Sequence, residues 1–213
     1  MNGVRSEQTP IALRGSTDTV IEFLQFAINS ILYQRGLYPP DMFRRVPKYG
    51  TSVLVTQDAQ LEAYLDRLLQ QHLRIWILRG SVHRIVLVVA AAAEPERVLE
   101  RWHFDLHLVP AVSGESIASR SEPEIMKEIQ AIIRQITASV TFLPLLDEPC
   151  SFDLLVYADP ALDADVDEWE ESGPKLITAE RCEQVKLRSF ATSIHRVETG
   201  VAYACKELAK ASP

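Results

Sequence analysis

The sequence predicts an α+β domain in which three helices pack on a mainly antiparallel sheet. Helical and strand-like apolar patterns are not regularly interleaved, so the βαβ units of a doubly wound sheet are not expected. From Ile125 to Tyr157 a helical apolar stripe changes, without a glycine, into the alternating pattern of a half-buried strand. The chain has 213 residues, 47% of them hydrophobic, which is enough for the core of one domain.

Three helices account for the longest apolar stripes. The first is expected from Thr17 to Arg35, with Ser16 as its N-cap and Gly36 just past its end, and its broad stripe predicts a central, deeply buried helix. The second is expected from about Asp58 to Leu73. Ser121 and Glu124 have the spacing of a capping box, and they start a third helix that runs to about Ser139.

The strands are predicted from alternation and from β-branched runs. A short strand covers Ser52 to Thr56, and Val82 to Ala93 forms a hairpin with Val98 to Leu108, which has one wet face. An edge strand carries Cys150, Phe152, Leu154 and Val156. The C-terminal strands are expected at Lys175 to Thr178 and Val185 to Val197.

An acidic connection separates the edge strand from the C-terminal strands. Asp159 to Pro174 contains seven Asp or Glu residues and no Lys or Arg, so it is expected to be solvated. Trp169 lies inside it and needs an apolar surface, which makes it a candidate anchor. A chain end attached through such a connection could move.

Composition narrows the class of partner. The formal charge of -7 argues against binding to nucleic acid or to anionic membranes, because both need clustered cations, and it favours basic peptides. Cys150, Cys182 and Cys205 form no CxxC motif, so neither a disulfide framework nor a zinc site is indicated and a reducing compartment is expected. No secretory h-region or apolar run long enough to span a bilayer is seen, so a soluble intracellular protein without membrane insertion is expected.

Motifs for catalysis are not found. The sequence has no glycine-rich phosphate loop and no G-x-S-x-G elbow, so we expect neither an enzyme nor a bound cofactor. One chemical alternative is a metal site of His103, Asp105 and His107, which share a strand face, together with His83. The simpler interpretation is the exposed polar face of an amphipathic strand.

Other conspicuous residues also allow two interpretations. Trp76 and Trp102 are most simply core aromatics. Arg134 and Gln135 lie on the polar side of the third helix, where they form either a solvated face or an interface.

Several runs, in order along nearly the whole chain, resemble HORMA-domain proteins of the spindle assembly checkpoint. The runs are Leu13–Ser16, Ile28–Gly36, Lys48–Gly50, Leu99–Trp102, Ile133–Ala138, Val140–Leu146, Ser151–Leu155, Trp169–Pro174 and Leu187–Phe190. The loop from Pro110 to Arg120 and the end from Ala204 to Pro213 depart from the family pattern.

The resemblance implies a single HORMA domain with two stable topologies. Residues 1–12 would be a mobile N-terminal segment, residues 13–158 the core, and residues 159–213 a mobile C-terminal safety belt of the same domain. In the open topology the C-terminal strands lie over the sheet edge. In the closed topology they cross over, and a partner peptide is clasped as an added strand.

The resemblance also implies roles for particular residues. Arg134, Gln135, Thr141 and Phe142 would form the interface for an asymmetric homodimer and for an adaptor. Leu13 would lie where the N-terminal segment rearranges, and Trp169, Phe190 and Tyr203 would belong to the belt. By position, Thr192 and Ser193 are candidate regulatory phosphorylation sites.

The implied partners are proteins. They are a coiled-coil kinetochore checkpoint receptor, an activator of the anaphase-promoting complex, a subunit of the complex related to a checkpoint kinase, and an AAA+ remodelling ATPase with a HORMA-like adaptor. The expected locations are the nucleus and cytoplasm, the kinetochore in mitosis and the nuclear envelope in interphase.

Two kinds of alternative function are left open. One is a HORMA adaptor of a translesion polymerase or of the meiotic chromosome axis, and the other is a metal-dependent hydrolase.

Overall fold

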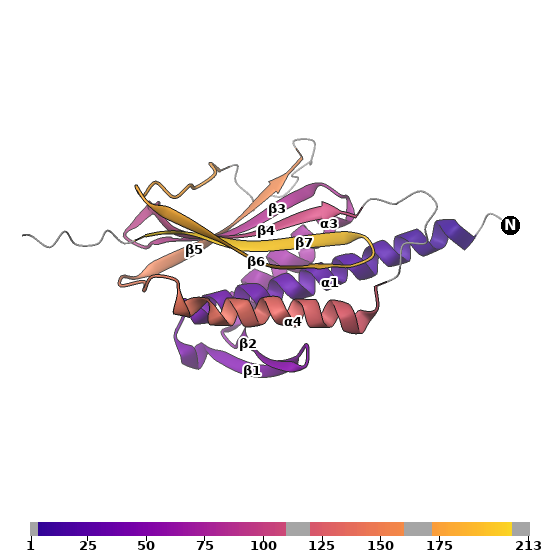
Figure 1. Cartoon of the computed structure of the whole chain (residues 1–213), viewed down its shortest axis with the longest axis horizontal. Coiled ribbons are helices and arrows are strands. Elements are labelled where there is room, and N and C mark those ends of the chain that lie inside the picture. The colour runs from indigo at the N-terminus through magenta and orange to yellow at the C-terminus, as the bar shows by residue number, and fades with distance from the viewer. Residues whose placement is uncertain (1–3, 110–119, 160–171, 206–213) are drawn as a thin grey trace, which may run out of the picture.

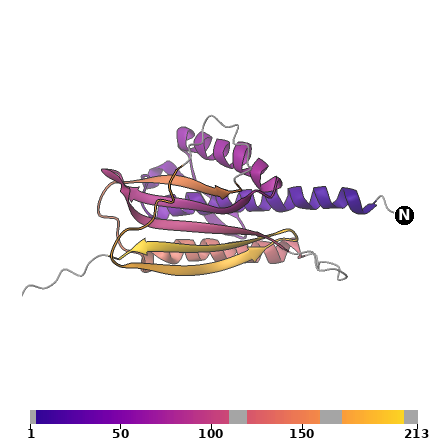
Figure 2. The ribbon, with the colours of Figure 1, turned by 90° about the horizontal axis from the view of Figure 1, so that it is seen from above.

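The computed structural model describes residues 4–109, 120–159 and 172–205, with side chains from residue 11 onward. A five-stranded sheet in the order β5-β3-β4-β7-β6 covers the helices, and every neighbouring strand pair is antiparallel. Helix α1 lies under the sheet between α4 on one side and the α2–α3 segment on the other (Figure 1, Figure 2). The described residues therefore form the predicted α+β architecture.

Helix α1 (Val4–Gln34) is the central helix, with a face from Val20 to Leu32 that is almost completely buried. It begins well before the predicted start at Thr17, so Ser16 is not an N-cap but a buried residue inside the helix. Its hydroxyl bonds to Thr192 and His195 instead of to the helix backbone. The helix also runs through residues 4–12, which were expected to be a separate segment; their mobility stays a prediction. Gly36, at φ 64°, follows the helix end as predicted.

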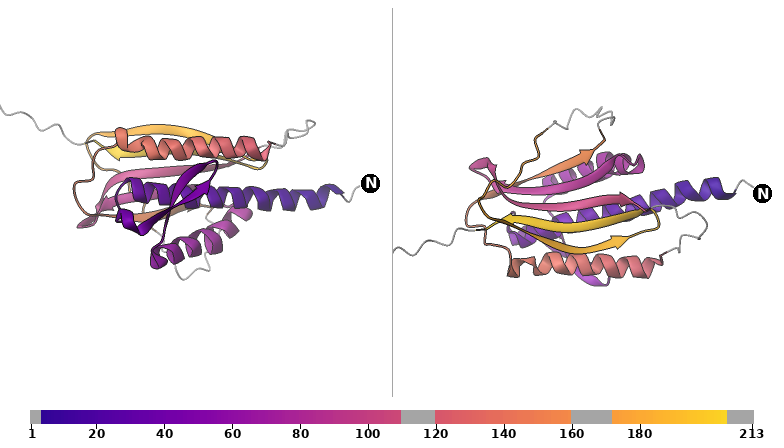
Figure 3. Two further views of the ribbon diagram at one scale, coloured as in Figure 1. Left: turned by 90° about the horizontal axis from the view of Figure 1, so that it is seen from below. Right: turned by 45° about the horizontal axis from the view of Figure 1, so that its top comes forward.

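A small hairpin of β1 (Phe43–Lys48) and β2 (Thr51–Thr56) packs on α1 (Figure 3, left). Strand β2 was predicted and β1 was not, because its basic residues and Pro47 hide the strand pattern. The turn at Tyr49 and Gly50 has positive φ at both positions, which suits the right-handed twist of a two-residue hairpin.

The second helical segment starts where the sequence predicts. Asp58 accepts hydrogen bonds from the backbone N–H groups of Gln60 and Leu61 at the start of α2 (Ala59–Asp66). The chain continues through a π-helical stretch (Arg67–Leu73) into α3 (Arg74–Leu78), so the segment is longer than expected and buries Trp76.

Strands β3 (Val82–Ala91) and β4 (Glu94–Leu108) form the predicted hairpin, and β3 is the buried strand between β4 and β5. Trp102, Phe104 and Leu106 point into the core, while Leu108, at the end of the strand, is 60% exposed. Helix α4 (Glu122–Ala138) begins with the predicted capping box at Ser121 and is followed by a 3-10 turn (Ser139–Thr141) and β5 (Cys150–Ala158).

The C-terminal strands differ from the prediction. They are β6 (Cys182–Ala191) and β7 (His195–Ala204), so Lys175 to Thr178 is not a strand and Val185 to Val197 is interrupted by a turn. The Thr192 hydroxyl makes this turn by accepting hydrogen bonds from the backbone N–H groups of Ile194 and His195. A threonine in a strand-like run gives no signal of such a turn.

The β6–β7 hairpin pairs with β4, on the side of the sheet away from β5. The chain therefore has to cross from one edge of the sheet to the other between β5 and β6 (Figure 3, right). Within the described residues, Ile177 lies on this path and packs with Val86, Val88 and Val98 on the face opposite the helices. This arrangement matches the closed topology that the resemblance implies.

Candidate functional site

Strand β5 forms an edge of the sheet. It pairs with β3 from Cys150 to Ala158, and no strand of the described residues pairs with its other side. No residue of β5 is fully buried, although Phe152, Leu154 and Val156 all pack against the core as the alternation predicts. An apolar strand with unpaired backbone groups on one side is suited to accept an added strand.

An aromatic cluster lies on the helix side of this edge. The Phe152 ring makes edge-to-face contacts with Tyr38 at 6.2 Å and with Tyr64 at 6.1 Å between ring centroids. Burial raises the pKa of both tyrosines, with Asp58 adding to the effect at Tyr38 and Asp153 at Tyr64. The edge therefore offers an apolar aromatic surface with carboxylates close by, which suits apolar side chains next to basic ones.

The crossing segment, residues 172–181 between β5 and β6, is fastened over this part of the sheet by three contacts. Lys175 forms an ion pair with Asp153 of β5. The Tyr157 hydroxyl donates to the Pro174 carbonyl at 3.5 Å, and Ile177 packs against the same Val86, Val88 and Val98 cluster as Leu155 and Tyr157 of β5. Residues 174–177 thus lie over the strand that has the free edge. Trp169, the predicted anchor, lies outside the described residues.

Phe190 and Tyr203, the described residues of the predicted safety belt, lie in the hairpin; Phe190 packs it against α1, and Tyr203 joins its two strands. Phe190 is 1% exposed, and its ring lies 4.9 Å from that of Phe23 in α1. Tyr203 is also buried and donates a hydrogen bond to Glu183 at 2.8 Å, which, together with burial, raises its pKa to about 12.

The predicted interface residues lie along the end of α4. Arg134 is exposed, and Phe142 is 40% exposed beside the exposed Val140. Thr141 is exposed and donates a hydrogen bond to the Ala138 carbonyl. Gln135 has a role that the sequence did not indicate, because its side-chain oxygen accepts a hydrogen bond from the backbone N–H of Arg188 at 2.7 Å. The predicted interface residues therefore adjoin strand β6.

Leu13, the predicted switch residue, lies on α1 and is half-buried. It belongs to the turn of the helix before Ser16, whose hydroxyl contacts the hairpin. The N-terminal part of α1 and the hairpin are thus in contact in this topology.

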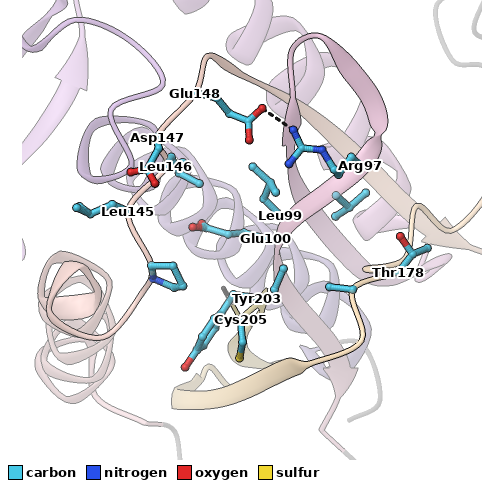
Figure 4. Close-up of a pocket in the computed structure, with 14 residues that line it drawn as sticks. Arg97, Leu99, Glu100, Leu145, Leu146, Asp147, Glu148, Thr178, Tyr203 and Cys205 are labelled. Carbon is cyan, nitrogen blue, oxygen red and sulfur yellow. Dashed lines mark hydrogen bonds and ion pairs between the residues drawn. The ribbon is translucent and has the colours of Figure 1, made fainter. Parts of the chain in front are cut away.

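A cavity of about 310 Å³ was not anticipated from the sequence (Figure 4). It lies between the start of β4, residues 144–148, Thr178 and Ala179 of the crossing segment, and the end of β7. Beside it, Arg35 pairs with Glu100, whose other oxygen accepts from the Trp102 indole at 3.0 Å. Both charges of this pair are buried, and their positions are 65 residues apart, so no local pattern reveals it.

The residues considered as a metal site do not share a common centre, because they contact different partners. His83 bonds to Asp159 at 2.7 Å, Asp105 pairs with Arg84, and the His103 ring lies against Gly200 of β7. His107 is exposed. Across residues 4–109, 120–159 and 172–205, no three His, Cys, Asp or Glu side chains are grouped as metal ligands would be. None of the helices described combines the length and apolarity that crossing a membrane requires.

The family model for the HORMA domain matches residues 16–195. The chain belongs to the HORMA domain family. Among relatives, it is 54% identical to the mitotic spindle assembly checkpoint protein MAD2A of Dictyostelium discoideum, covering 95% of this chain and 98% of the relative. The human protein of the same name is 49% identical over 93% of this chain and 95% of its own length. Within the family, the chain is therefore an orthologue of the spindle assembly checkpoint members.

Solved structures agree with this assignment. A chain in the crystal structure of the mitotic checkpoint complex aligns with a TM-score of 0.79 and 41% identity, covering 90% of this chain and 99% of that one. Caenorhabditis elegans HTP-2 bound to the HIM-3 closure motif aligns with a TM-score of 0.72 over 88% of this chain and 90% of that one, but at 12% identity it shows the fold alone.

A relative with a different name is less similar in sequence. A fission yeast DNA polymerase zeta processivity subunit is 30% identical over 63% of this chain and 65% of its own length.

Proposed function

We propose that the protein is a spindle assembly checkpoint component that switches between open and closed topologies and clasps a partner peptide along β5, as a non-catalytic binding protein. Its ligands are a kinetochore receptor and the activator of the anaphase-promoting complex, which it thereby helps to inhibit. The observation that carries the proposal is the free edge of β5, with the crossing segment fastened over it and the hairpin docked at β4. The checkpoint relatives and the mitotic checkpoint complex structure favour this function over the two HORMA alternatives.

The same arrangement gives a reason why conversion between the two topologies would be slow. To return the hairpin to the β5 side, the ladder between β4 and β7, which extends from Glu100 to Leu108, has to break before new hydrogen bonds form. We propose that an asymmetric homodimer through Arg134, Gln135, Thr141 and Phe142 templates this conversion, and that an AAA+ ATPase with its adaptor reverses it. A location at kinetochores in mitosis, and in the nucleus and cytoplasm otherwise, follows from the same function.

Charge reversal at the fastening point of the crossing segment tests the clasp. Lys175→Glu places like charges beside Asp153, and we expect a fluorescent peptide with an apolar core and basic flanks to dissociate roughly three times faster. The double variant Lys175→Glu with Asp153→Lys restores the pair and should restore the slow dissociation. If full-length protein captures no such peptide, the proposed function is wrong; if the single variant releases it at the parental rate, the crossing segment is not part of the clasp.

Client identity is tested by exchanging peptides. Motifs from the checkpoint receptor, from a translesion polymerase and from a meiotic axis protein are compared in the same assay. We expect the checkpoint peptide to bind at least tenfold more tightly. Equal or reversed preferences would favour one of the two HORMA alternatives.

A further inference from the structure

Three buried polar side chains join the hairpin to α1. The Ser16 hydroxyl lies 2.6 Å from Nδ1 of His195 and 2.5 Å from the hydroxyl of Thr192. His195 is 1% exposed, and the two hydroxyl residues are 5% exposed. Ser16 belongs to the helix, whereas Thr192 lies in the turn of the hairpin and His195 is the first residue of β7. We call this set the hairpin latch.

The hairpin latch exists only where the hairpin is docked beside β4. If the hairpin moved to the β5 side of the sheet, His195 would leave Ser16, because β4 and β5 are separated by β3. These hydrogen bonds are made only while the hairpin is docked, so the three groups together favour this topology. The Thr192 hydroxyl also accepts from the backbone N–H groups that form the turn, which couples turn geometry to docking.

The surroundings of His195 suit a neutral imidazole. Ser16 from α1 and Thr192 from the turn are uncharged, and the cavity beside the ring is lined by Ile77 from α3, by Val82 and His83 from β3 and by Leu106, His107 and Leu108 from β4. His83 has its own carboxylate, Asp159. Burial is the cause that lowers the pKa of His195 to about 4 among the residues that the structure describes.

We propose that the hairpin latch is a pH-sensitive device that holds the closed topology at neutral pH and is released when His195 is protonated. The proposal rests on the two-topology function proposed above. Because the pKa of His195 is lowered on docking, its contribution is fully present above the ordinary value of about 6.5 and is lost as pH falls from there towards 4. A drop from pH 7.5 to 5.5 should therefore shift the docking equilibrium about tenfold towards the undocked form.

A second histidine acts in the same direction. Burial lowers the pKa of His103, which lies against Gly200 of β7, although nearby Asp105 opposes the effect. The positively charged Arg84, Arg101 and Lys186 also lower the pKa of His103. The contribution of His103 to the pH dependence of docking is separated from that of His195 by substituting His195 alone.

The experiment measures the docked fraction of the full chain, without peptide, from backbone amide signals of β7 in NMR spectra between pH 7.5 and 5.5. We expect the docked-to-undocked ratio to fall about tenfold or more in the parent protein. His195→Gln should remove most of this slope, and any slope that His103 contributes should remain. A ratio that does not change with pH in the parent protein, or an unchanged slope in His195→Gln, would overturn the proposal.

Ser16→Ala separates the latch from general folding. Alanine is a better helix former than serine, so α1 itself is not weakened, yet the docked ratio should fall roughly tenfold because His195 loses its partner. Thr19→Ala is the matched control, since the Thr19 hydroxyl donates to the Gly15 carbonyl within α1. Equal ratios for Ser16→Ala and Thr19→Ala would contradict the latch. Peptide capture at pH 7.5 is measured in parallel, so that failure of the latch is distinguished from failure of the clasp.

Discussion

Ser16 shows how one residue can have two plausible roles that only tertiary contacts decide. A serine in front of an apolar helical stripe is a good N-cap, and the sequence favoured that role. The structure instead buries it within α1, where its partners are 176 and 179 residues away. Propensity and capping rules are local, so they could not place this hydroxyl. In contrast, Glu124 was placed correctly, because its capping partner Ser121 is only three residues away.

The buried Arg35–Glu100 pair gives a prediction at the same scale. Glu100→Gln leaves the Arg35 charge buried without its counter-ion, so the free energy of unfolding in urea should fall by about 3–5 kcal/mol. Glu148→Gln is the control, because it removes a partner of Arg97 at the surface and should leave the unfolding midpoint nearly unchanged. Similar losses of unfolding free energy in both variants would show that burial of the ion pair does not determine the cost of removing its carboxylate.

At the scale of elements, long apolar patterns were predicted better than connections. The stripe of α4 and the alternation of β4 and β5 fixed their faces, because burial enforces a period of 3.6 or 2. Strand β1 and the turn at Thr192 were missed for physical reasons. The pairing of β1 with β2 is not visible in its polar residues, and the turn is built by a side-chain hydroxyl rather than by glycine.

The docking of β7 on β4 gives the prediction at this scale. A Cβ atom at Gly200 would lie 2.6 Å from the His103 ring and 3.0 Å from the Val185 carbonyl oxygen. Gly200→Ala should therefore disfavour the docked hairpin roughly tenfold, as faster amide hydrogen exchange in β7 would report.

His103→Ala combined with Gly200→Ala tests the cause. Removal of the ring should recover most of the lost protection in β7, while the contact with the Val185 carbonyl leaves a remainder. If the double variant exchanges as fast as Gly200→Ala, the ring is not the obstacle.

At the scale of the whole molecule, the class of fold and the membership of the family followed from the sequence, but the topology did not. The hydrophobic pattern of the C-terminal strands does not specify the edge of the sheet on which they pair. The order β5-β3-β4-β7-β6 is therefore information that the structure adds. The predicted interface residues Arg134 and Phe142 are exposed at the end of α4, whereas Trp169 lies outside the described residues.

The proposed function requires that β5 receives a peptide as a new strand while the hairpin stays on β4. It is tested most directly by NMR of the isotope-labelled chain bound to an unlabelled peptide with an apolar core and basic flanks. We expect interstrand contacts between the peptide backbone and β5, with the pairing of Trp102 and Val201 between β4 and β7 retained. Contacts of the peptide elsewhere, or a β6–β7 hairpin paired with β5 in the complex, would contradict the account.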